Sequence, residues 1–348
     1  MSFTTIVLGW FRENGRDLPW RHTRDPYAVW LSEIILQQTR IEQGLPYWEH
    51  FMRTWPTVQH LASASEDEVL RAWQGLGYYS RARNLLAAAR QIVAAGGFPT
   101  TIAGLQKLKG VGEYTAAAIG SIAFDLPAAV VDGNVYRVLA RHFGITTPIN
   151  TTVGKKEFAA LAQSLLPPQE ASAYNQAMMD FGAVQCTPAS PRCWCCPLAE
   201  TCCALVTGSI DKLPVKLNKM KIKERQLTYV YVRCNGQTAL HRRSAGDIWQ
   251  GLYEPWLTET VPQEAVLLRQ HIRHVLTHRV IYADFWLWET QERPILPEDY
   301  FWIDENDIDH YGVPRLVELL LQELSKGEER NTGLEPATLG LGSQCSTN

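Results

Sequence analysis

The chain has 348 residues, 36 acidic against 33 basic side chains, and a formal net charge of −3. That length accommodates about two domains with cores of their own, and the slight negative charge excludes a protein that binds nucleic acid through a uniformly basic surface. Because no apolar run is long enough to span a bilayer and the N-terminus lacks the features of a signal peptide, we expect a cytoplasmic protein without membrane contact.

The first predicted elements are two helices separated by an irregular loop. Residues 4–15 predict an amphipathic helix, and residues 18–21 predict the loop. Asp25-Pro26 is a typical helix start, with the aspartate as N-cap and the proline in the first turn. We expect this second helix to continue over residues 27–44 and, being apolar on nearly every side up to Leu36, to be buried.

Glu33 lies inside that apolar stretch. A buried carboxylate is costly unless it is paired or protonated, so burial should raise the pKa of Glu33. The residues alone leave two interpretations open: a structural glutamate bonded to a neighbouring helix, or a catalytic acid.

Residues 46–105 predict several short helices broken at prolines and glycines. Within them, residues 75–85 (GLGYYSRARNL) combine a glycine-flexed turn, paired tyrosines, Arg81 and Arg83. An aromatic side chain beside basic residues suits insertion into a base stack while the arginines hold phosphates. A core tyrosine with surface arginines is the alternative.

Residues 107–137 carry two features at helix starts. Gly110 and Gly112 precede an Ala-rich segment, an arrangement that leaves the first backbone N–H groups of a helix facing an anion. After Pro127 and an apolar run, Asp132 stands where the next helix should begin and can cap it. Taken singly, a Gly-x-Gly before a helix is more often just a tight turn, and an aspartate before a helix is usually only a cap.

Residues 154–184 predict further helix and are followed by a cysteine-rich loop. Six of the eight cysteines lie between residues 186 and 203, which in a reducing compartment indicates a metal rather than disulfides. Four of them have the spacing Cys-x6-Cys-x2-Cys-x5-Cys: Cys186, Cys193, Cys196 and Cys202. Four thiolates can hold zinc or an iron–sulfur cluster, and their origin in one loop rather than two separated pairs favours the cluster.

In the remaining chain the hydrophobic periodicity changes from that of helices to that of strands. Residues 207–225 are polar and lysine-rich, as in an interdomain linker. Alternating apolar segments then flank Asn235-Gly236, which predicts a β-hairpin, and an amphipathic helix follows further on. Residues 327–348 have no periodicity and predict a disordered tail.

Together, the glycine hairpin, the aspartate after it and the cysteine loop resemble the helix–hairpin–helix superfamily of base-excision DNA glycosylases, and within it the adenine DNA glycosylase family. The resemblance covers about residues 5–325. It implies a multidomain fold with a mainly α catalytic region and a mixed α/β, MutT-like (Nudix-fold) C-terminal domain. The implied parts are a six-helix barrel (25–137), an iron–sulfur helical domain (1–24 with 138–206), a linker (207–225), an 8-oxoguanine-recognition domain (226–326) and the tail (327–348).

The resemblance implies a monomeric, monofunctional enzyme that removes adenine opposite 8-oxoguanine or guanine in duplex DNA, with one 4Fe-4S cluster on the four cysteines. Glu33 would protonate the adenine and later activate water, and Asp132 would stabilise the oxocarbenium-like sugar. Tyr114 and Asn134 would position these two groups. We expect the environments of the two carboxyl groups to separate their pKa values, with Glu33 favoured as the acid and Asp132, at a helix N-terminus, as the anion.

The resemblance also assigns contacts with DNA. The implied residues are Arg21 and Gln176 at the adenine, Gln38 inside the duplex near the lesion, Tyr78 as the wedge, Gly110 and Gly112 at a phosphate, and Thr277 and His278 at 8-oxoguanine. Several relatives have Phe-Ser-His where this chain has Leu276-Thr277-His278, so the hydroxyl and imidazole donors survive and the aromatic ring is lost.

The sequence disfavours several other functions. In the bifunctional endonuclease III type, a Schiff-base lysine occupies the position of Tyr114, so we expect no efficient strand cleavage. A glycosylase for thymine opposite guanine is disfavoured by Glu33 and the C-terminal domain. The intact pair of carboxylates disfavours a non-catalytic damage-binding protein, and the absence of a glutamate-rich box disfavours a Nudix hydrolase.

Overall fold

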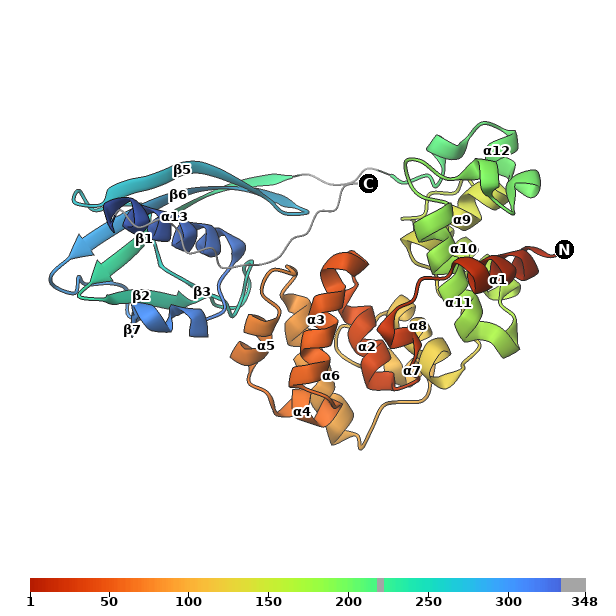
Figure 1. The fold of residues 1–348 in the computed structure, drawn as a ribbon, viewed down its shortest axis with the longest axis horizontal. Helices are drawn as coiled ribbons and strands as arrows, with labels where there is room; N and C mark the ends of the chain where they lie inside the picture. The colour runs from red at the N-terminus through yellow and green to blue at the C-terminus, as the bar shows by residue number, and fades with distance from the viewer. Residues whose placement is uncertain (218–221, 333–348) are drawn as a thin grey trace. The chain divides into compact units, whose positions relative to one another are not determined.

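The computed structural model describes residues 1–217 and 222–332 and divides into two compact units, Met1–Lys219 and Met220–Asn348. The first unit is helical and the second is built on a β-sheet (Figure 1). Within the predicted linker 207–225, residues 210–212 form a single helical turn and the first strand already begins at Lys223. Among the described residues, no helix combines the length and the hydropathy needed to cross a membrane.

The helices of the first unit are α1 (Phe3–Asn14), α2 (Pro26–Ile35), α3 (Ile41–Thr54), α4 (Val58–Ser63), α5 (Glu66–Ala72), α6 (Ser80–Ala94), α7 (Ile102–Leu105), α8 (Glu113–Phe124), α9 (Gly133–Phe143), α10 (Thr152–Leu165), α11 (Ala171–Asp180) and α12 (Cys203–Val206). They gather in two groups, α2 to α8 and α1 with α9 to α12 (Figure 1). Because α11 packs against α1 and α9 as well as α8, it joins the two groups.

The core of the second group explains why residues far apart in the chain pack together. Apolar side chains of α1, α9, α10 and α11 form one buried cluster, which includes Val7, Leu139, Phe158 and Met178. Leu213, beyond α12, packs into the same cluster. Part of the predicted linker therefore belongs to the helical core.

The prediction of one continuous helix over residues 27–44 was wrong. α2 ends at Ile35, and α3 begins only at Ile41. The buried guanidinium of Arg81, from α6, donates to the carbonyl oxygens of Ile35 at 2.9 Å and Gln37 at 2.5 Å. It thereby satisfies carbonyls that a continuing helix would have used itself.

This placement also overturns the prediction that Arg81 holds a phosphate. The side chain is 8% exposed, and its donors face carbonyl groups inside the protein, including those of Leu76 and Gly77. Because the Arg81 guanidinium donates to backbone carbonyls, it stabilises the fold and is not part of a DNA-binding surface.

The second unit contains β1 (Lys223–Cys234), β2 (Gln237–Arg242), β3 (Tyr253–Glu254), β4 (Trp256–Leu257), β5 (Val266–Val275), β6 (Arg279–Thr290), β7 (Tyr300–Asp304) and α13 (Arg315–Thr332). The strand order is β3-β2-β1-β6-β5, with β4 paired to β1 and β7 to β2. β1 and β6 are parallel along their whole length, while the other pairs are antiparallel.

Two features of this sheet were visible in the sequence. The predicted hairpin at Asn235-Gly236 is confirmed, because both residues have positive φ (51° and 75°) and join β1 to β2. The amphipathic helix α13 packs its apolar side on the sheet through residues such as Leu316 and Leu320. It extends to Thr332, past the predicted start of the tail at residue 327, and residues 333–348 lie outside the described part of the chain.

Asn175 of α11 offers a test of how the fold holds the loop before α9. It is 1% exposed; its Oδ1 accepts from the Val130 N–H at 3.0 Å, and its Nδ2 donates to Ala128 O at 2.8 Å and Ser121 Oγ at 2.9 Å. We expect Asn175→Ala to lower the free energy of unfolding by about 1–3 kcal/mol, because it leaves buried polar groups unpaired. Urea denaturation measures this, with the exposed Lys156→Ala as control; equal midpoints for both variants would contradict the assignment.

Candidate active site

A cavity of about 410 Å³ opens in the first unit and is lined by residues from both groups of helices. Six of the predicted site residues line it: Arg21, Glu33, Tyr114, Asp132, Asn134 and Gln176. They come from the loop after α1 and from α2, α8, the start of α9 and α11. Residues separated by more than a hundred positions in the chain therefore meet at one cavity.

Glu33 is the buried carboxyl group of this cavity. Its side chain belongs to α2, is 9% exposed, and accepts a hydrogen bond at Oε2 from the hydroxyl of Tyr114 at 2.8 Å. Burial raises the pKa of Glu33 to about 7, and nearby Asp132 raises it further, against the opposing effects of Tyr114 and Arg21. The predicted direction is confirmed: this carboxyl group can hold a proton near neutral pH.

Asp132 caps α9 as predicted. Its Oδ1 accepts from the Val135 N–H at 2.7 Å, and its Oδ2 accepts from the Asn134 side-chain amide at 2.8 Å. The expectation that the helix terminus would leave this group with a low pKa was wrong, because burial raises the pKa of Asp132 above its ordinary value. The hydrogen bonds from Val135 and Asn134 act in the opposite direction and favour the anion.

A buried carboxylate that sequence reasoning missed organises one wall of the cavity. Asp180, at the end of α11, is fully buried and accepts hydrogen bonds from Nη1 and Nη2 of Arg21, each at 2.8 Å. The Arg16 side chain binds the same carboxylate at 2.5 Å. Burial would raise the pKa of Asp180, but hydrogen bonds from Arg21 and Arg16 outweigh it and hold the pKa below its ordinary value. Asp180 thus fixes Arg21 at the cavity. The sequence feature that could have indicated Asp180 is an aspartate within the apolar helical segment 174–183.

Arg137 of α9 was also missed, and it ties the cavity to the cysteine loop. Its guanidinium donates to Asn134 Oδ1 at 2.8 Å, to Gly182 O at 2.6 Å and to Cys186 O at 2.7 Å. A Cβ added at Gly182 would lie 2.5 Å from the Cβ of Asn134, so only glycine permits this approach. Asn134, which holds Asp132, is therefore itself held by the segment that leads into the cysteines.

The predicted phosphate-binding turn has the expected backbone. Gly110 has φ of 76°, a conformation that favours glycine, and Gly112 is the N-cap of α8 without a side-chain cap. A Cβ at Gly110 would lie 2.9 Å from the Cβ of Asn84. The N-terminus of α8 thus offers backbone N–H groups that no capping side chain covers.

The other predicted DNA contacts do not line the cavity. Gln38 is exposed and has φ of 57° in the turn between α2 and α3. Tyr78 is 45% exposed with φ of 47°, and the Arg81 guanidinium lies 5.6 Å from the centre of its ring. Thr277 and His278 belong to the second unit, where both are exposed at the tip of the hairpin between β5 and β6. Their roles stay predictions.

The four spaced cysteines line one small cavity of about 30 Å³. All four are half-buried, whereas Cys195 and Cys203, which lie outside the spacing of the four, are exposed. The buried Arg141 guanidinium lies against this loop: it donates to Cys186 Sγ at 3.4 Å and to Thr187 O at 2.7 Å. In the part of the chain that is described, no three His, Cys, Asp or Glu side chains converge as ligands of a single ion. A four-iron cluster takes one thiolate at each iron, and four thiols on one cavity beside a cation fit such an anionic group.

Comparison with known proteins agrees with this geometry. Residues 31–168 match the HhH-GPD superfamily base excision DNA repair proteins, and residues 228–323 match the NUDIX domain. A solved structure of a thermostable thymine-DNA glycosylase is 31% identical, with a TM-score of 0.55 over 59% of this chain and 95% of that one. An endonuclease III in a non-covalent complex with DNA shares the fold at 22% identity and a TM-score of 0.51, over 60% of this chain and 99% of that one.

Three curated adenine DNA glycosylases are more similar in sequence. The one from Schizosaccharomyces pombe is 39% identical over 90% of this chain and 85% of its own length. The one from Buchnera aphidicola of Schizaphis graminum is 35% identical over 72% of this chain and 73% of its own length. The human one is 45% identical over 61% of this chain and 43% of its own length.

The helical fold, the glycine turn at α8 and the two carboxyl groups on one cavity define a DNA glycosylase of base excision repair. Within that class, the chain belongs to the adenine DNA glycosylase family. It is therefore an enzyme that acts on adenine in DNA.

The raised pKa of Glu33 predicts a pH-dependent stability. The pKa of Glu33 is about 7 in the folded state and 4.5 ordinarily. The free energy of unfolding of the wild type, compared with that of Glu33→Gln, is therefore highest below pH 4.5 and falls as the pH rises through 7. Between about pH 5.5 and 8.5 we expect the variant to gain about 2 kcal/mol in free energy of unfolding over the wild type. Urea denaturation at both pH values tests this, and a pH-independent difference would show that Glu33 ionises as freely as in water.

Proposed function

We propose that the enzyme hydrolyses the N-glycosidic bond of adenine mispaired with 8-oxoguanine or guanine in duplex DNA and does not cleave the strand. The observation that carries this proposal is the buried carboxyl of Glu33, with its pKa near 7, on the same 410 Å³ cavity as Asp132. A flipped adenine would enter that cavity, since its glycosidic bond is out of reach inside the base stack.

Glu33 supplies the proton in this mechanism. Neutral adenine leaves poorly, so a general acid must protonate the base as the bond to the sugar breaks. The hydroxyl of Tyr114 holds the Glu33 carboxyl in one orientation at 2.8 Å. After the base departs, the Glu33 carboxylate takes a proton from the attacking water.

Asp132 acts on the other fragment. The breaking bond leaves positive charge on the sugar, and a carboxylate within the cavity stabilises that charge electrostatically or by a transient covalent bond. Two donors, the Val135 N–H and the Asn134 amide, keep the group oriented and favour its anion. Arg21, fixed by Asp180, and Gln176 line the same cavity, which supports their proposed contact with the adenine ring.

DNA binding and lesion reading involve groups outside the cavity. The uncapped N-terminus of α8 at Gly112 suits a phosphate, and the exposed Tyr78 suits a wedge between bases. The match of residues 228–323 to the NUDIX domain and the exposure of Thr277 and His278 support their assignment to 8-oxoguanine.

The cleavage assay tests both the chemistry and the absence of lyase action. A duplex with one adenine opposite 8-oxoguanine is incubated with the enzyme, and half of each sample is heated in alkali. We expect cleavage of the adenine strand only after alkali, because Tyr114 cannot form a Schiff base. Cleavage without alkali would restore the endonuclease III type of reaction.

Substitution of the acid tests its role in the same assay. We expect Glu33→Gln to slow single-turnover base removal by a factor of about 10² to 10⁴, because the amide cannot donate the proton at neutral pH. The exposed Glu13→Gln on α1 serves as a charge-matched control and should keep the wild-type rate. A Glu33→Gln variant that turns over at the wild-type rate would remove Glu33 from the mechanism.

We further propose that Cys186, Cys193, Cys196 and Cys202 hold one 4Fe-4S cluster. The cluster supplies no step of the hydrolysis, which requires no electron transfer. Arg137 and Arg141 connect its loop to α9, so the cluster would hold the segment on which Asn134 and Asp132 depend. Its role is then structural, with effects on the geometry of the site.

Iron and sulfide analysis tests the cluster assignment. The wild type should contain about four iron atoms and a visible absorption band, and Cys193→Ser should lose both. Cys195→Ser, two residues away and exposed, should keep them. Stoichiometric zinc without iron in the wild type would contradict the cluster.

A further inference from the structure

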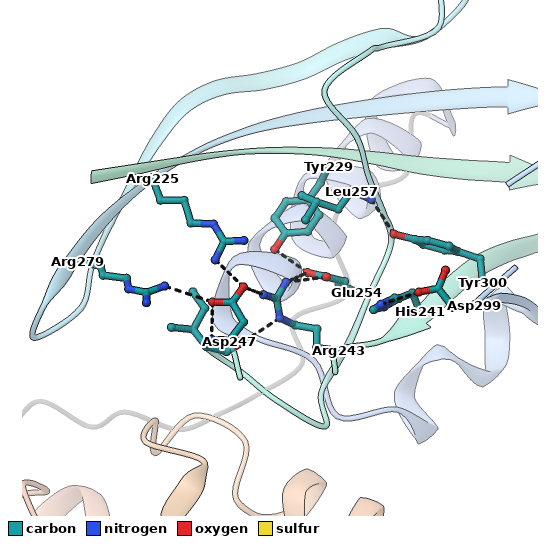
Figure 2. Close-up of polar contacts among 11 residues, drawn as sticks. Arg225, Tyr229, His241, Arg243, Asp247, Glu254, Leu257, Arg279, Asp299 and Tyr300 are labelled. Atoms are coloured by element: carbon teal, nitrogen blue, oxygen red, sulfur yellow. Dashed lines mark hydrogen bonds and ion pairs between the residues drawn. The ribbon is translucent and has the colours of Figure 1, made fainter. Parts of the chain in front are cut away.

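The loop between β2 and β3 of the second unit contains a carboxylate that binds three arginines. Asp247 accepts from Arg225 at 2.5 Å, from Arg243 at 2.7 Å and from Arg279 at 3.2 Å. Figure 2 shows the three guanidinium groups pointing at this one side chain. Arg225 belongs to β1, Arg243 follows β2 and Arg279 begins β6, so one carboxylate connects three strands. We call this set the Asp247 cluster.

The Asp247 cluster is anchored on the inner side by a buried network. Arg243 is 6% exposed, and its Nη1 lies 2.5 Å from Glu254 Oε2. The hydroxyl of the buried Tyr229 donates to the same Glu254 oxygen at 3.0 Å (Figure 2). Arg243 cannot shift without leaving buried charges unpaired, which is costly, so Asp247 has a fixed inner support.

The outer side of the cluster reaches the hairpin tip. Arg279 directly follows Thr277 and His278, and its carbonyl accepts from the Leu276 N–H at 2.8 Å to close the turn. The Lys223 N–H, two residues before Arg225 on β1, donates to His278 O at 3.1 Å. Both outer arginines of the cluster therefore stand next to the backbone that carries Thr277 and His278.

A second contact links the same loop to the hairpin. Trp249, two residues after Asp247 and with φ of 59°, has its ring 6.0 Å from the ring of His274 on β5. The loop thus contacts the hairpin on both of its strands, through Arg279 on β6 and His274 on β5.

We propose that Asp247 is a positioning residue that holds the hairpin of Thr277 and His278 in the conformation that reads 8-oxoguanine, an inference that rests on the function proposed above. Two exposed residues at a hairpin tip lose conformational freedom on binding, and a support that orders them beforehand reduces that loss. Without the carboxylate, Arg243 would stay paired with Glu254, but the outer guanidinium groups of Arg225 and Arg279 would lose this partner and repel their positive neighbours. The two outer ones would then move the strands that carry the tip.

The test compares base removal opposite 8-oxoguanine and opposite guanine. The quantity measured is the kcat/KM opposite 8-oxoguanine divided by the kcat/KM opposite guanine. In Asp247→Asn we expect this ratio to fall by about tenfold or more, because displaced Thr277 and His278 lose their contact with 8-oxoguanine. The kcat/KM opposite guanine should change little. Asp247→Glu, which keeps the charge, should retain most of the ratio. Glu289→Gln removes one exposed charge from the other end of β6 and should leave the ratio unchanged.

A second variant and a second readout keep the inference testable. Arg279→Gln removes only the ion pair between Asp247 and the hairpin and should lower the ratio in the same way. This variant can be measured even if Asp247→Asn proves too unstable to purify. Hydrogen exchange should accelerate at residues 276–279 in both variants and stay unchanged in β2 and β7. If the folded variants keep the wild-type ratio, Asp247 does not position the reading hairpin.

His278→Ala distinguishes failure of this inference from failure of the proposed function. If the wild type does not discriminate, or if His278→Ala keeps the discrimination, the reading of 8-oxoguanine by this hairpin is wrong. If His278→Ala loses the discrimination and the variants of the Asp247 cluster keep it, only the positioning role is wrong.

Discussion

The burial of Glu33 is the constraint on which the catalytic unit depends. A carboxyl group 9% exposed on an apolar helix is held neutral at moderate pH by desolvation, and one hydroxyl, that of Tyr114, keeps it oriented. The surrounding helices create this environment at a cost in stability, because a carboxyl group with a raised pKa opposes folding once it ionises. Proteins accept such costs at functional sites and offset them elsewhere in the structure.

Buried arginines hold the irregular segments around this site. Arg81 ends α2 just after Glu33 by binding free carbonyls, and Arg137 and Arg141 join α9 to the cysteine loop through carbonyl oxygens. A guanidinium has five donors in a rigid fork, so one side chain can satisfy several carbonyls at an irregular turn. The irregular segments at this site are thereby tied by hydrogen bonds to the helices α6 and α9.

The sheet unit uses the same chemistry for a different purpose. There Arg243 is buried with Glu254, and Arg225 and Arg279 join it around the half-buried Asp247. The parallel pairing of β1 and β6 places Arg225 and Arg279 close together, since Lys223 is paired with Arg279 in the register. A single carboxylate can then connect strands whose sequences are far apart.

The sequence by itself determined the helical and sheet parts, the helix start at Asp25-Pro26, the cap at Asp132, the hairpin at Asn235-Gly236 and the burial of Glu33, because each follows from local periodicity or from the conformation of a few adjacent residues. Only the tertiary structure decided that α2 stops at Ile35, that Arg81 faces inward and that Asp180 fixes Arg21, since the partners lie 46 and 159 positions away along the chain. The pKa of Asp132 is of the same kind: its cap is local, but the desolvation that raises its pKa comes from segments that meet only in the folded protein.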